Sequence, residues 1–353
     1  MKHRLIFALV FLALLALIPA VAAANNVPSF DFVTPVFGLA AAPDGSLLVA
    51  DGGSGIVELR KGEGHQVVAL PGVTDVAPIG RGAMFATTGE FGPMASKLWR
   101  VSHDEGPVEI ADLLAFEIEN DPAGGEVQSN PYDVAALNGG TALVADAAGN
   151  DLLIVDNEGN VDWVATFPNE LAPTDNVRAL VGCPEPAVPE LAEICDLPPG
   201  LPIPAEPVAT SVTVGPDGAY YVGELKGFPA PVGMSKVWRI EPGTLHAECG
   251  TSSACSVVYD DFTSVIDLNF GPDGKLYVVE LDEASWLAVE LGAFGLPGAV
   301  GGTINACEAD GSGCTEVLSP VMIPTAVAID KKGAAYAAVG ALIPGAAQVI
   351  ALP

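Results

Sequence analysis

The chain has 353 residues, of which 14 are Lys or Arg and 44 are Asp or Glu, so its formal net charge is −30. A surface this negative repels nucleic acid and anionic lipid, and we therefore exclude nucleic acid as a partner. Hydrophobic residues make up 50% of the chain, which is enough to bury a sizeable core. The charge also attracts divalent cations and keeps proteins soluble in salt, so it indicates either a ligand or the habitat of the organism.

The first 24 residues have the pattern of a Sec signal peptide. A basic start at Lys2 and Arg4 precedes an apolar run over residues 5–18 and small residues that end at Ala24, after which we expect cleavage. An uncleaved anchor is the alternative, but the run is short for a membrane span. Since no later stretch is apolar enough to span a bilayer, we expect residues 25–353 to form one domain, secreted or otherwise extracytoplasmic, in the periplasm or at the cell exterior.

Six segments of this domain share one pattern, in which two apolar strands flank a turn with glycine. The segments are residues 38–51, 75–90, 133–146, 211–224, 267–280 and 326–339, with the turn glycines Gly45, Gly82, Gly140, Gly218, Gly274 and Gly333. Two more strand-like runs follow most hairpins, as at residues 151–155 and 161–167. Repeated units of four antiparallel strands predict an all-β fold, a six-bladed β-propeller of four-stranded antiparallel blades. A β-sandwich would not explain six copies of one hairpin.

The spacing of the repeats is irregular, which we attribute to insertions near residues 110–130, 168–207 and 285–302. The last repeat also lacks an obvious fourth strand after residues 348–352. Residues 29–34 could supply that strand and so close the ring, because an open ring would expose strand edges.

The six cysteines fall into close pairs, Cys183 with Cys195, Cys249 with Cys255 and Cys307 with Cys314. An even count in an exported chain favours disulfides, and pairing between neighbours would pin three loops or hairpins, although the sequence alone allows other connectivities. Zinc is the alternative, but no Cys-x-x-Cys occurs and only His246 lies near a pair.

Two stretches go beyond a generic propeller. The first combines Ala111-Asp-Leu-Leu-Ala-Phe-Glu117 with Ser129-Asn-Pro-Tyr-Asp133 and Leu143-Val-Ala-Asp-Ala-Ala-Gly-Asn-Asp-Leu-Leu153, and the second is Tyr221-Val-Gly-Glu-Leu-Lys-Gly-Phe-Pro229. They resemble the ScyD/ScyE family, which is named for genes of cyanobacterial scytonemin biosynthesis. The resemblance covers essentially the whole mature chain and implies an exported propeller, but it supplies no catalytic residues. The similarity to NHL-type propellers is looser and implies only the fold.

A constant register links acidic residues to the turns. Six residues after the turn glycine stand Asp51, Thr88, Asp146, Glu224, Glu280 and Val339, and seven before it stand Gly38, Asp75, Asp133, Ser211, Asp267 and Ala326. If the turn has two residues, these positions face each other at the end of the innermost strands near the axis. A wider turn or a bulge would shift the register by one residue and remove this pairing.

In this register Asp133 would face Asp146, and Asp267 would face Glu280. Like charges across a strand pair are destabilising, so they require a cation, a shared proton or a hydrogen-bond donor. Hard oxygen ligands favour Ca²⁺ or Mg²⁺, and we take Ca²⁺ as the candidate cofactor. The candidate metal ligands are Asp133, Asp146, Asp267, Glu280, Glu224, Asp51 and Asp75. The alternative is that these carboxylates only cap loops, accept backbone N–H groups and face a water-filled channel.

Other chemistry is poorly represented. The histidines of the mature chain, His65, His103 and His246, fall in outer strands or loops, which disfavours a His-dependent mechanism at the axis. There is no nucleophile elbow and no glycine-rich phosphate loop. Trp99 and Trp238 occupy matching third-strand positions, where we expect them to pack between blades.

The sequence supports two classes of function. The first is a monomeric binding or scaffold protein that holds a small molecule or an extracytoplasmic protein partner on one propeller face, with or without a divalent cation. The second is a metal-assisted hydrolase or isomerase similar to propeller lactonases, in which Asp133, Asp146, Asp267, Glu224 or Glu280 would bind Ca²⁺ or act as base. A role in extracellular secondary metabolism rests on the family resemblance alone.

Overall fold

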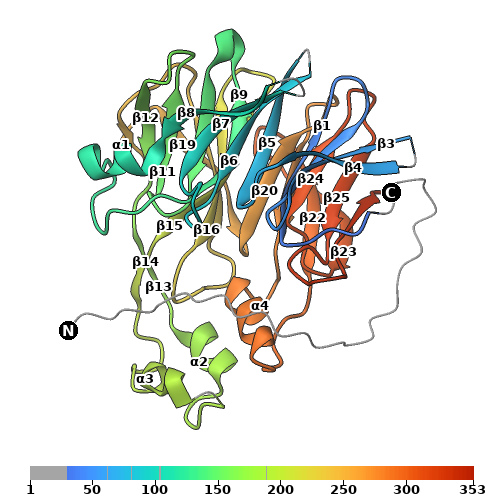
Figure 1. Ribbon diagram of the computed structural model, residues 1–353. Coiled ribbons are helices and arrows are strands. Elements are labelled where there is room, and N and C mark those ends of the chain that lie inside the picture. The colour runs from blue at the N-terminus through green and yellow to red at the C-terminus, as the bar shows by residue number, and fades with distance from the viewer. Residues whose placement is uncertain (1–29, 62, 81, 103–104, 188) are drawn as a thin grey trace.

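The computed structural model describes residues 30–353 except 62, 81, 103–104 and 188, so the predicted signal peptide lies outside the described residues. The chain forms the predicted six-bladed β-propeller (Figure 1). The innermost strands β1, β5, β9, β15, β20 and β24 each contact the next, and β24 contacts β1, so the ring is closed.

Each blade is one antiparallel sheet, and the strands follow the chain from the axis outward. The first three blades contain β1 Val36–Ala41, β2 Leu47–Asp51, β3 Gly55–Arg60 and β4 Glu63–Ala69; β5 Val73–Gly80, β6 Ala83–Thr88, β7 Lys97–Ser102 and β8 Gly106–Asp112; β9 Pro131–Ala136, β10 Ala142–Asp146, β11 Asp151–Val155 and β12 Val161–Thr166. The last three contain β15 Pro207–Val214, β16 Tyr220–Lys226, β17 Ser235–Ile240 and β19 Cys255–Phe262; β20 Val265–Phe270, β21 Leu276–Glu280, β22 Gly302–Cys307 and β23 Cys314–Val321; β24 Ala326–Ile329, β25 Ala335–Val339 and β26 Gln348–Ala351. The short strand β18 Ala247–Glu248 adds in parallel to β12.

Helices and short strands occupy the connections between these sheets. They are α1 Leu113–Asn120, α2 Asp175–Val181, α3 Ala192–Cys195, α4 Trp286–Ala293, β13 Glu170–Ala172 and β14 Ile203–Ala205. The helices α2, α3 and α4 gather at one end of the propeller (Figure 1), where α2 contacts both α3 and α4. Among the residues that the structure describes, no helix has both the length and the apolar character needed to cross a bilayer.

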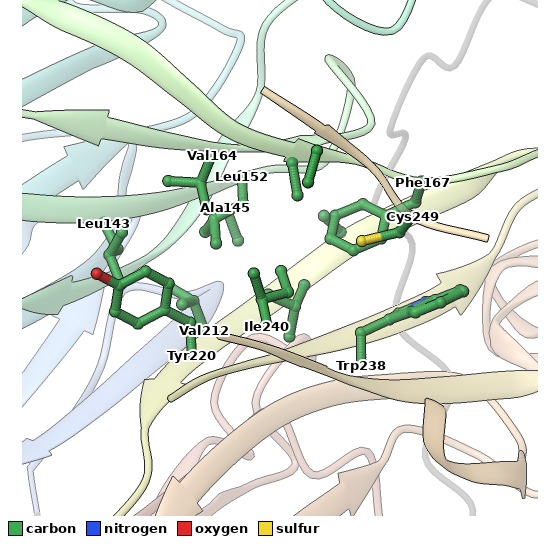
Figure 2. Packing of buried hydrophobic residues seen from close by; sticks show 14 residues of the cluster. Leu143, Ala145, Leu152, Val164, Phe167, Val212, Tyr220, Trp238, Ile240 and Cys249 are labelled. Atoms are coloured by element: carbon green, nitrogen blue, oxygen red, sulfur yellow. The ribbon is translucent and has the colours of Figure 1, made fainter. Parts of the chain in front are cut away.

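The hydrophobic core is divided among the seams between blades. Figure 2 shows the seam between blades three and four, where Leu143 and Val164 face Tyr220 and Ile240. Equivalent clusters fill the other five seams, including the one between blades six and one. Each blade is therefore stabilised by apolar burial against two neighbours, which a ring supplies only when it is closed.

The two matching tryptophans lie in these seams, as predicted. Trp99 is 8% exposed and Trp238 is 4% exposed. The indole N–H of Trp99 donates to Thr88 Oγ1 at 3.0 Å, and that of Trp238 donates to Glu224. The repeated position therefore combines apolar packing with a satisfied polar group.

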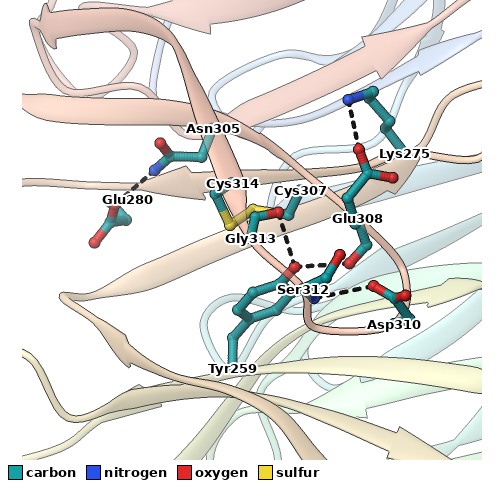
Figure 3. Close-up of a disulfide and its surroundings, with 10 residues drawn as sticks. All are labelled: Tyr259, Lys275, Glu280, Asn305, Cys307, Glu308, Asp310, Ser312, Gly313 and Cys314. Atoms are coloured by element: carbon teal, nitrogen blue, oxygen red, sulfur yellow. Dashed lines mark hydrogen bonds and ion pairs between the residues drawn. A yellow bond between two sulfur atoms is a disulfide. The ribbon is translucent and has the colours of Figure 1, made fainter.

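The cysteines form the predicted neighbour disulfides, Cys183–Cys195, Cys249–Cys255 and Cys307–Cys314. Figure 3 shows the third, which closes the hairpin between β22 and β23 of blade five. The hydroxyl of Tyr259 on β19 of blade four donates to the carbonyls of Glu308 and Gly313 in this hairpin. The disulfide therefore stiffens an outer hairpin that also contacts the adjacent blade.

The ring does not close with the strand predicted for residues 29–34. Ser29 lies outside the described residues, residues 30–34 form no strand, and the sixth sheet has three strands in the described part of the chain. The amides of Val33 and Thr34 donate to the Asp51 carboxylate instead of to a strand. Closure comes from Phe32, which packs between blades one and six, and from Val36, whose amide donates to the carbonyl of Ala341.

We expect Phe32→Ala to lower the free energy of unfolding by roughly 3 kcal/mol or more, because Phe32 is 7% exposed and its removal leaves a cavity. Urea unfolding of the oxidised protein measures this. Val33→Ala is the matched control, since Val33 is 59% exposed. Equal losses in the two variants would contradict the role assigned to Phe32.

Candidate functional site: the axial carboxylates

The predicted pairing of acidic residues across the first two strands is wrong. Asp133 pairs with Ala145, and Asp267 pairs with Val279. In five blades the turn encloses three residues rather than two, as shown by the N–H of Gly215 donating to the carbonyl of Ala219. Blade two reaches the same register through an irregularity in β5. The opposed pairs therefore do not form.

The acidic residues seven positions before the turn glycine instead join neighbouring blades. The carboxylates of Asp75, Asp133 and Asp267 each accept the backbone N–H of the next blade's innermost strand. The donors are Val134 at 3.2 Å, Val212 at 2.7 Å and Val327 at 2.6 Å, respectively. These bonds cross the seams between blades two and three, three and four, and five and six.

A second set of inter-blade bonds comes from threonines one position earlier, which the sequence analysis missed. Thr74, Thr210 and Thr325 donate from Oγ1 to carbonyls of the next blade at 2.7, 2.7 and 2.9 Å. In blades two and four the threonine lies in a break in the register of the innermost strand. The recurrence of threonine eight positions before the turn glycine in alternate blades was a signal available in the sequence.

The three axial aspartates influence one another electrostatically. Burial, followed by the charges of Asp133 and Asp267, raises the pKa of Asp75 well above its usual range. Burial also raises the pKa of Asp133, although its direct contact with the Asp75 carboxyl opposes this shift. Burial raises the pKa of Asp267 in the same way. The carboxyls of Asp75 and Asp133 thus lie in direct contact, and burial also raises the pKa of Tyr132 beside them.

Glycine at position 38 makes room for this cluster. A Cβ built on Gly38 would overlap Asp75 Oδ1 and lie 2.8 Å from the Asp75 backbone. Blade one therefore contributes no carboxylate at the position where blades two, three and five do, and Asp75 occupies the space instead.

The acidic residues six positions after the glycine hold loops. Asp51 accepts the amides of Val33, Thr34 and Gly53. Asp146 accepts the Ser129 hydroxyl at 2.6 Å and three backbone amides.

The two glutamates at this position are also hydrogen-bonded. Glu280 accepts the amide of Thr263 and the side chain of Asn305, and burial raises its pKa to about 7. Glu224 accepts the Trp238 indole and pairs with Lys226. These contacts match the loop-capping alternative from the sequence.

A metal site formed by the predicted ligands is not supported by this arrangement. In the described residues no group of three or more His, Cys, Asp or Glu side chains is placed to hold a metal ion. The axial Ca²⁺ site therefore stays a prediction.

The histidines lie away from these carboxylates in the sequence of strands. His65 lies on β4, and His246 pairs with Asp162 in an exposed contact at 2.7 Å. His103 lies outside the described residues.

The structure also places buried charged groups that sequence reasoning did not identify. Lys226 is 1% exposed and pairs with Glu224 and, at 2.6 Å, with Glu170 of β13. Glu117 of α1 and Asp151 of β11 are 1% and 0% exposed, and their carboxyls lie next to each other. Burial and the charge of Asp146 raise the pKa of Glu117 to about 8. No spacing rule links residue 117 to residue 151, because the approach of α1 to blade three is a tertiary contact.

An open cleft of about 540 Å³ lies between α1, β8 and the outer hairpin of blade three. Its lining includes the carboxylates of Glu109, Asp112, Glu119 and Asp162. Lys97 neutralises part of this charge by pairing with Glu109 at 2.9 Å and Asp112 at 3.0 Å.

Solved structures confirm the class of fold, a β-propeller. The chain is similar to the PQQ-bound aldose sugar dehydrogenase of Streptomyces coelicolor, with TM-score 0.54, 13% identity and coverage of 94% of this chain and 96% of that one. A putative glucose dehydrogenase of Thermus thermophilus gives TM-score 0.54 and 17% identity over 94% and 98% of the chains. A calcium-binding protein, regucalcin, of Agrobacterium tumefaciens gives 0.51 and 13% over 90% and 84%. At these identities the likeness shows the fold alone. No protein-family model and no curated protein matches the chain.

We expect Asp75→Asn to flatten the pH dependence of stability. A carboxyl whose pKa is raised on folding binds a proton in the folded state, so it stabilises the protein below the unfolded pKa of about 4 and loses that contribution as pH rises through the folded pKa. The asparagine amide can accept the Val134 N–H and donate to the Asp133 carboxyl, but it does not titrate. Between pH 5 and pH 8 the fall in unfolding free energy should be shallower than in wild type, by up to about 1.4 kcal/mol per pH unit.

Chemical denaturation at fixed ionic strength over this pH range measures the difference. Asp156→Asn is the control, because hydrogen bonds from Asn160 lower the pKa of Asp156 and its titration lies below this range. Parallel curves for wild type and Asp75→Asn would show that Asp75 is already ionised.

Proposed function

We propose that the protein is a binding or scaffold propeller outside the cytoplasm, which holds a small molecule or an extracytoplasmic partner on its loop face. We define the loop face as the end of the propeller where the second and fourth strands of each blade end. The observation that carries the proposal is the concentration of exposed large apolar side chains at this face.

Ten of the thirteen exposed large apolar residues in the described part of the chain belong to segments that join strand ends at the loop face, although one of them, Ile118, lies on α1 beside the outer hairpin of blade three. Phe91, Leu171, Phe294 and Val300 are the most prominent, with exposures of 60, 65, 65 and 61%. By contrast, Val108 and Val257 lie on outer strands, and Leu245 lies in a turn at the opposite end. Exposed apolar groups gathered on one face are typical of interaction sites, because a partner removes them from water.

The same face carries the helical insertions. Val177 and Val181 of α2 pack against Leu291 of α4, and the Cys183–Cys195 disulfide lies in the same cluster. Exposed residues such as Phe294 are thus held on a packed support rather than on free loops. Binding residues on loops positioned by a rigid scaffold are the usual arrangement in propellers and other β folds.

Export is part of the proposal. Three disulfides indicate an oxidising, extracytoplasmic environment, and the predicted signal peptide over residues 1–24 agrees with it. Membership of the ScyD/ScyE family, a link to extracellular secondary metabolism and a monomeric state also belong to the proposal, the first two from the sequence resemblance.

The metal-assisted hydrolase or isomerase is less well supported. Its candidate ligands and base accept hydrogen bonds from backbone amides or side chains, as Asp133 does from Val212 and Glu280 does from Thr263. These bonds give the carboxylates a structural role. Turnover of a panel of lactones that EDTA abolishes would favour the enzyme instead.

We expect a photo-reactive phenylalanine analogue to crosslink a partner when it replaces Phe91 or Phe294, but not when it replaces Val108 or Val257. Each variant is incubated with the extracytoplasmic fraction of the source organism, irradiated and analysed by mass spectrometry. The proposal predicts one added mass at both loop-face positions, suppressed by excess unmodified protein. An added mass equal to the chain itself would show self-association and contradict the monomer, and equal labelling at the control positions would contradict the loop face.

A further inference from the structure

Two buried carboxyl groups between α1 and blade three have no hydrogen-bond partner for several of their oxygens. Glu117 Oε1 and both carboxyl oxygens of Asp151 are shielded from solvent and accept no hydrogen bond from an amide, hydroxyl or cationic group of the described chain, although the two carboxyls contact each other. Asn150 Oδ1, from the adjacent residue, is in the same condition. Buried acceptors without donors are costly, and their accumulation in one place indicates a missing positive or donating group.

The surrounding protein supplies no such group. Four donors are near, the Ser129 hydroxyl and the amides of residues 130, 148 and 149, but all of them are bonded to Asp146. None of the ion pairs found in the described residues includes Glu117, Asp146 or Asp151. Asp146, Asp151 and Glu117 therefore place three carboxyl groups in one region without a cationic side chain.

The backbone of the neighbouring turn approaches these oxygens closely. Gly149 lies in the turn between β10 and β11, and a Cβ built on it would lie 3.3 Å from Asp151 Oδ1 and 3.2 Å from the Asp146 carboxyl carbon. Any larger residue at position 149 would crowd the two carboxyl groups. Glycine thus allows the backbone of the turn to lie next to both carboxyl groups.

We propose that Glu117 and Asp151 bind a Ca²⁺ ion between α1 and blade three, with Asn150 Oδ1 as a further oxygen ligand. Carboxylate and amide oxygens are the ligands that Ca²⁺ prefers, and its variable coordination suits donors from a helix and a separate turn better than the strict octahedron of Mg²⁺. The Asp146 carboxylate, already hydrogen-bonded, adds negative potential without being a required ligand.

This site is distinct from the axial carboxylates and does not depend on the loop-face proposal. Its consequence is mechanical, because Glu117 belongs to the helix inserted between blades two and three. A bound ion would fix α1 against the turn of blade three and would thereby hold one wall of the cleft that α1 lines.

Isothermal titration of the EDTA-treated, disulfide-intact mature protein with CaCl₂ tests the proposal. We expect binding of one ion per chain and a rise in Tm that NaCl of equal ionic strength does not give and that MgCl₂ gives only weakly. Glu117→Gln should abolish both the heat and the Tm rise, because it removes one ligand charge at nearly constant shape. Asp151→Asn is the second variant, should Glu117→Gln fail to fold.

Two controls locate the ion. Glu119→Gln, on an exposed residue of the same helix, should bind Ca²⁺ as wild type does. Asp133→Asn should also retain Ca²⁺ binding. Loss of Ca²⁺ binding in this variant would place the ion at the axis and overturn this assignment. No stoichiometric heat and no Ca²⁺-specific Tm rise in wild type would overturn the proposal as well, and would leave Glu117 and Asp151 as a carboxyl pair that shares a proton.

Discussion

Hydrogen bonds between the innermost strands of successive blades are the constraint on which the ring depends. The six innermost strands converge at the axis, where side-chain carboxylates and hydroxyls form hydrogen bonds with backbone groups of the next blade. Asp75, Asp133 and Asp267 accept backbone amides there, and Thr74, Thr210 and Thr325 donate to backbone carbonyls. Five of the six seams carry at least one such bond. At the remaining seam, between blades one and two, Gly38 lets Asp75 approach closely.

This arrangement explains why so many acidic residues lie near the axis without defining a metal centre there. Burial raises the pKa values of these carboxyls, and a backbone amide donates a hydrogen bond to each of them. The hydrogen bonds of these axial carboxyls join blades, and the further features that point to binding lie elsewhere. The apolar side chains belong to the loop face, and the unpartnered carboxyls lie where the insertion α1 meets β11 of blade three. Both sites include residues of connections, whereas the repeated strands supply the support.

The fold could be predicted from the sequence because the same hairpin pattern occurs six times, once for each blade. The hairpins and the tryptophan positions follow from the spacing, and the structure selects the neighbour disulfides from the connectivities that the sequence allowed. The register failed because the turns hold three residues, although Pro216-Asp217-Gly218 carried the clue: Asp217 accepts the amide of Ala219 and stabilises the wider turn. The threonine bonds could have been predicted, because threonine recurs at the same position in alternate blades. The contact of Glu117 with Asp151 could not be predicted, because the path of an insertion is set by tertiary packing and not by the repeat.

The most direct test of the inter-blade bonds is amide hydrogen exchange in wild type and in Asp133→Ala. We expect the amides of Val212 and Val327 to be strongly protected in wild type, since each donates to an axial aspartate. In the variant, Val212 should lose protection while Val327, which Asp267 serves, keeps it. Unchanged protection of Val212, or an equal loss at both amides, would contradict the claim that individual carboxylates join individual blades.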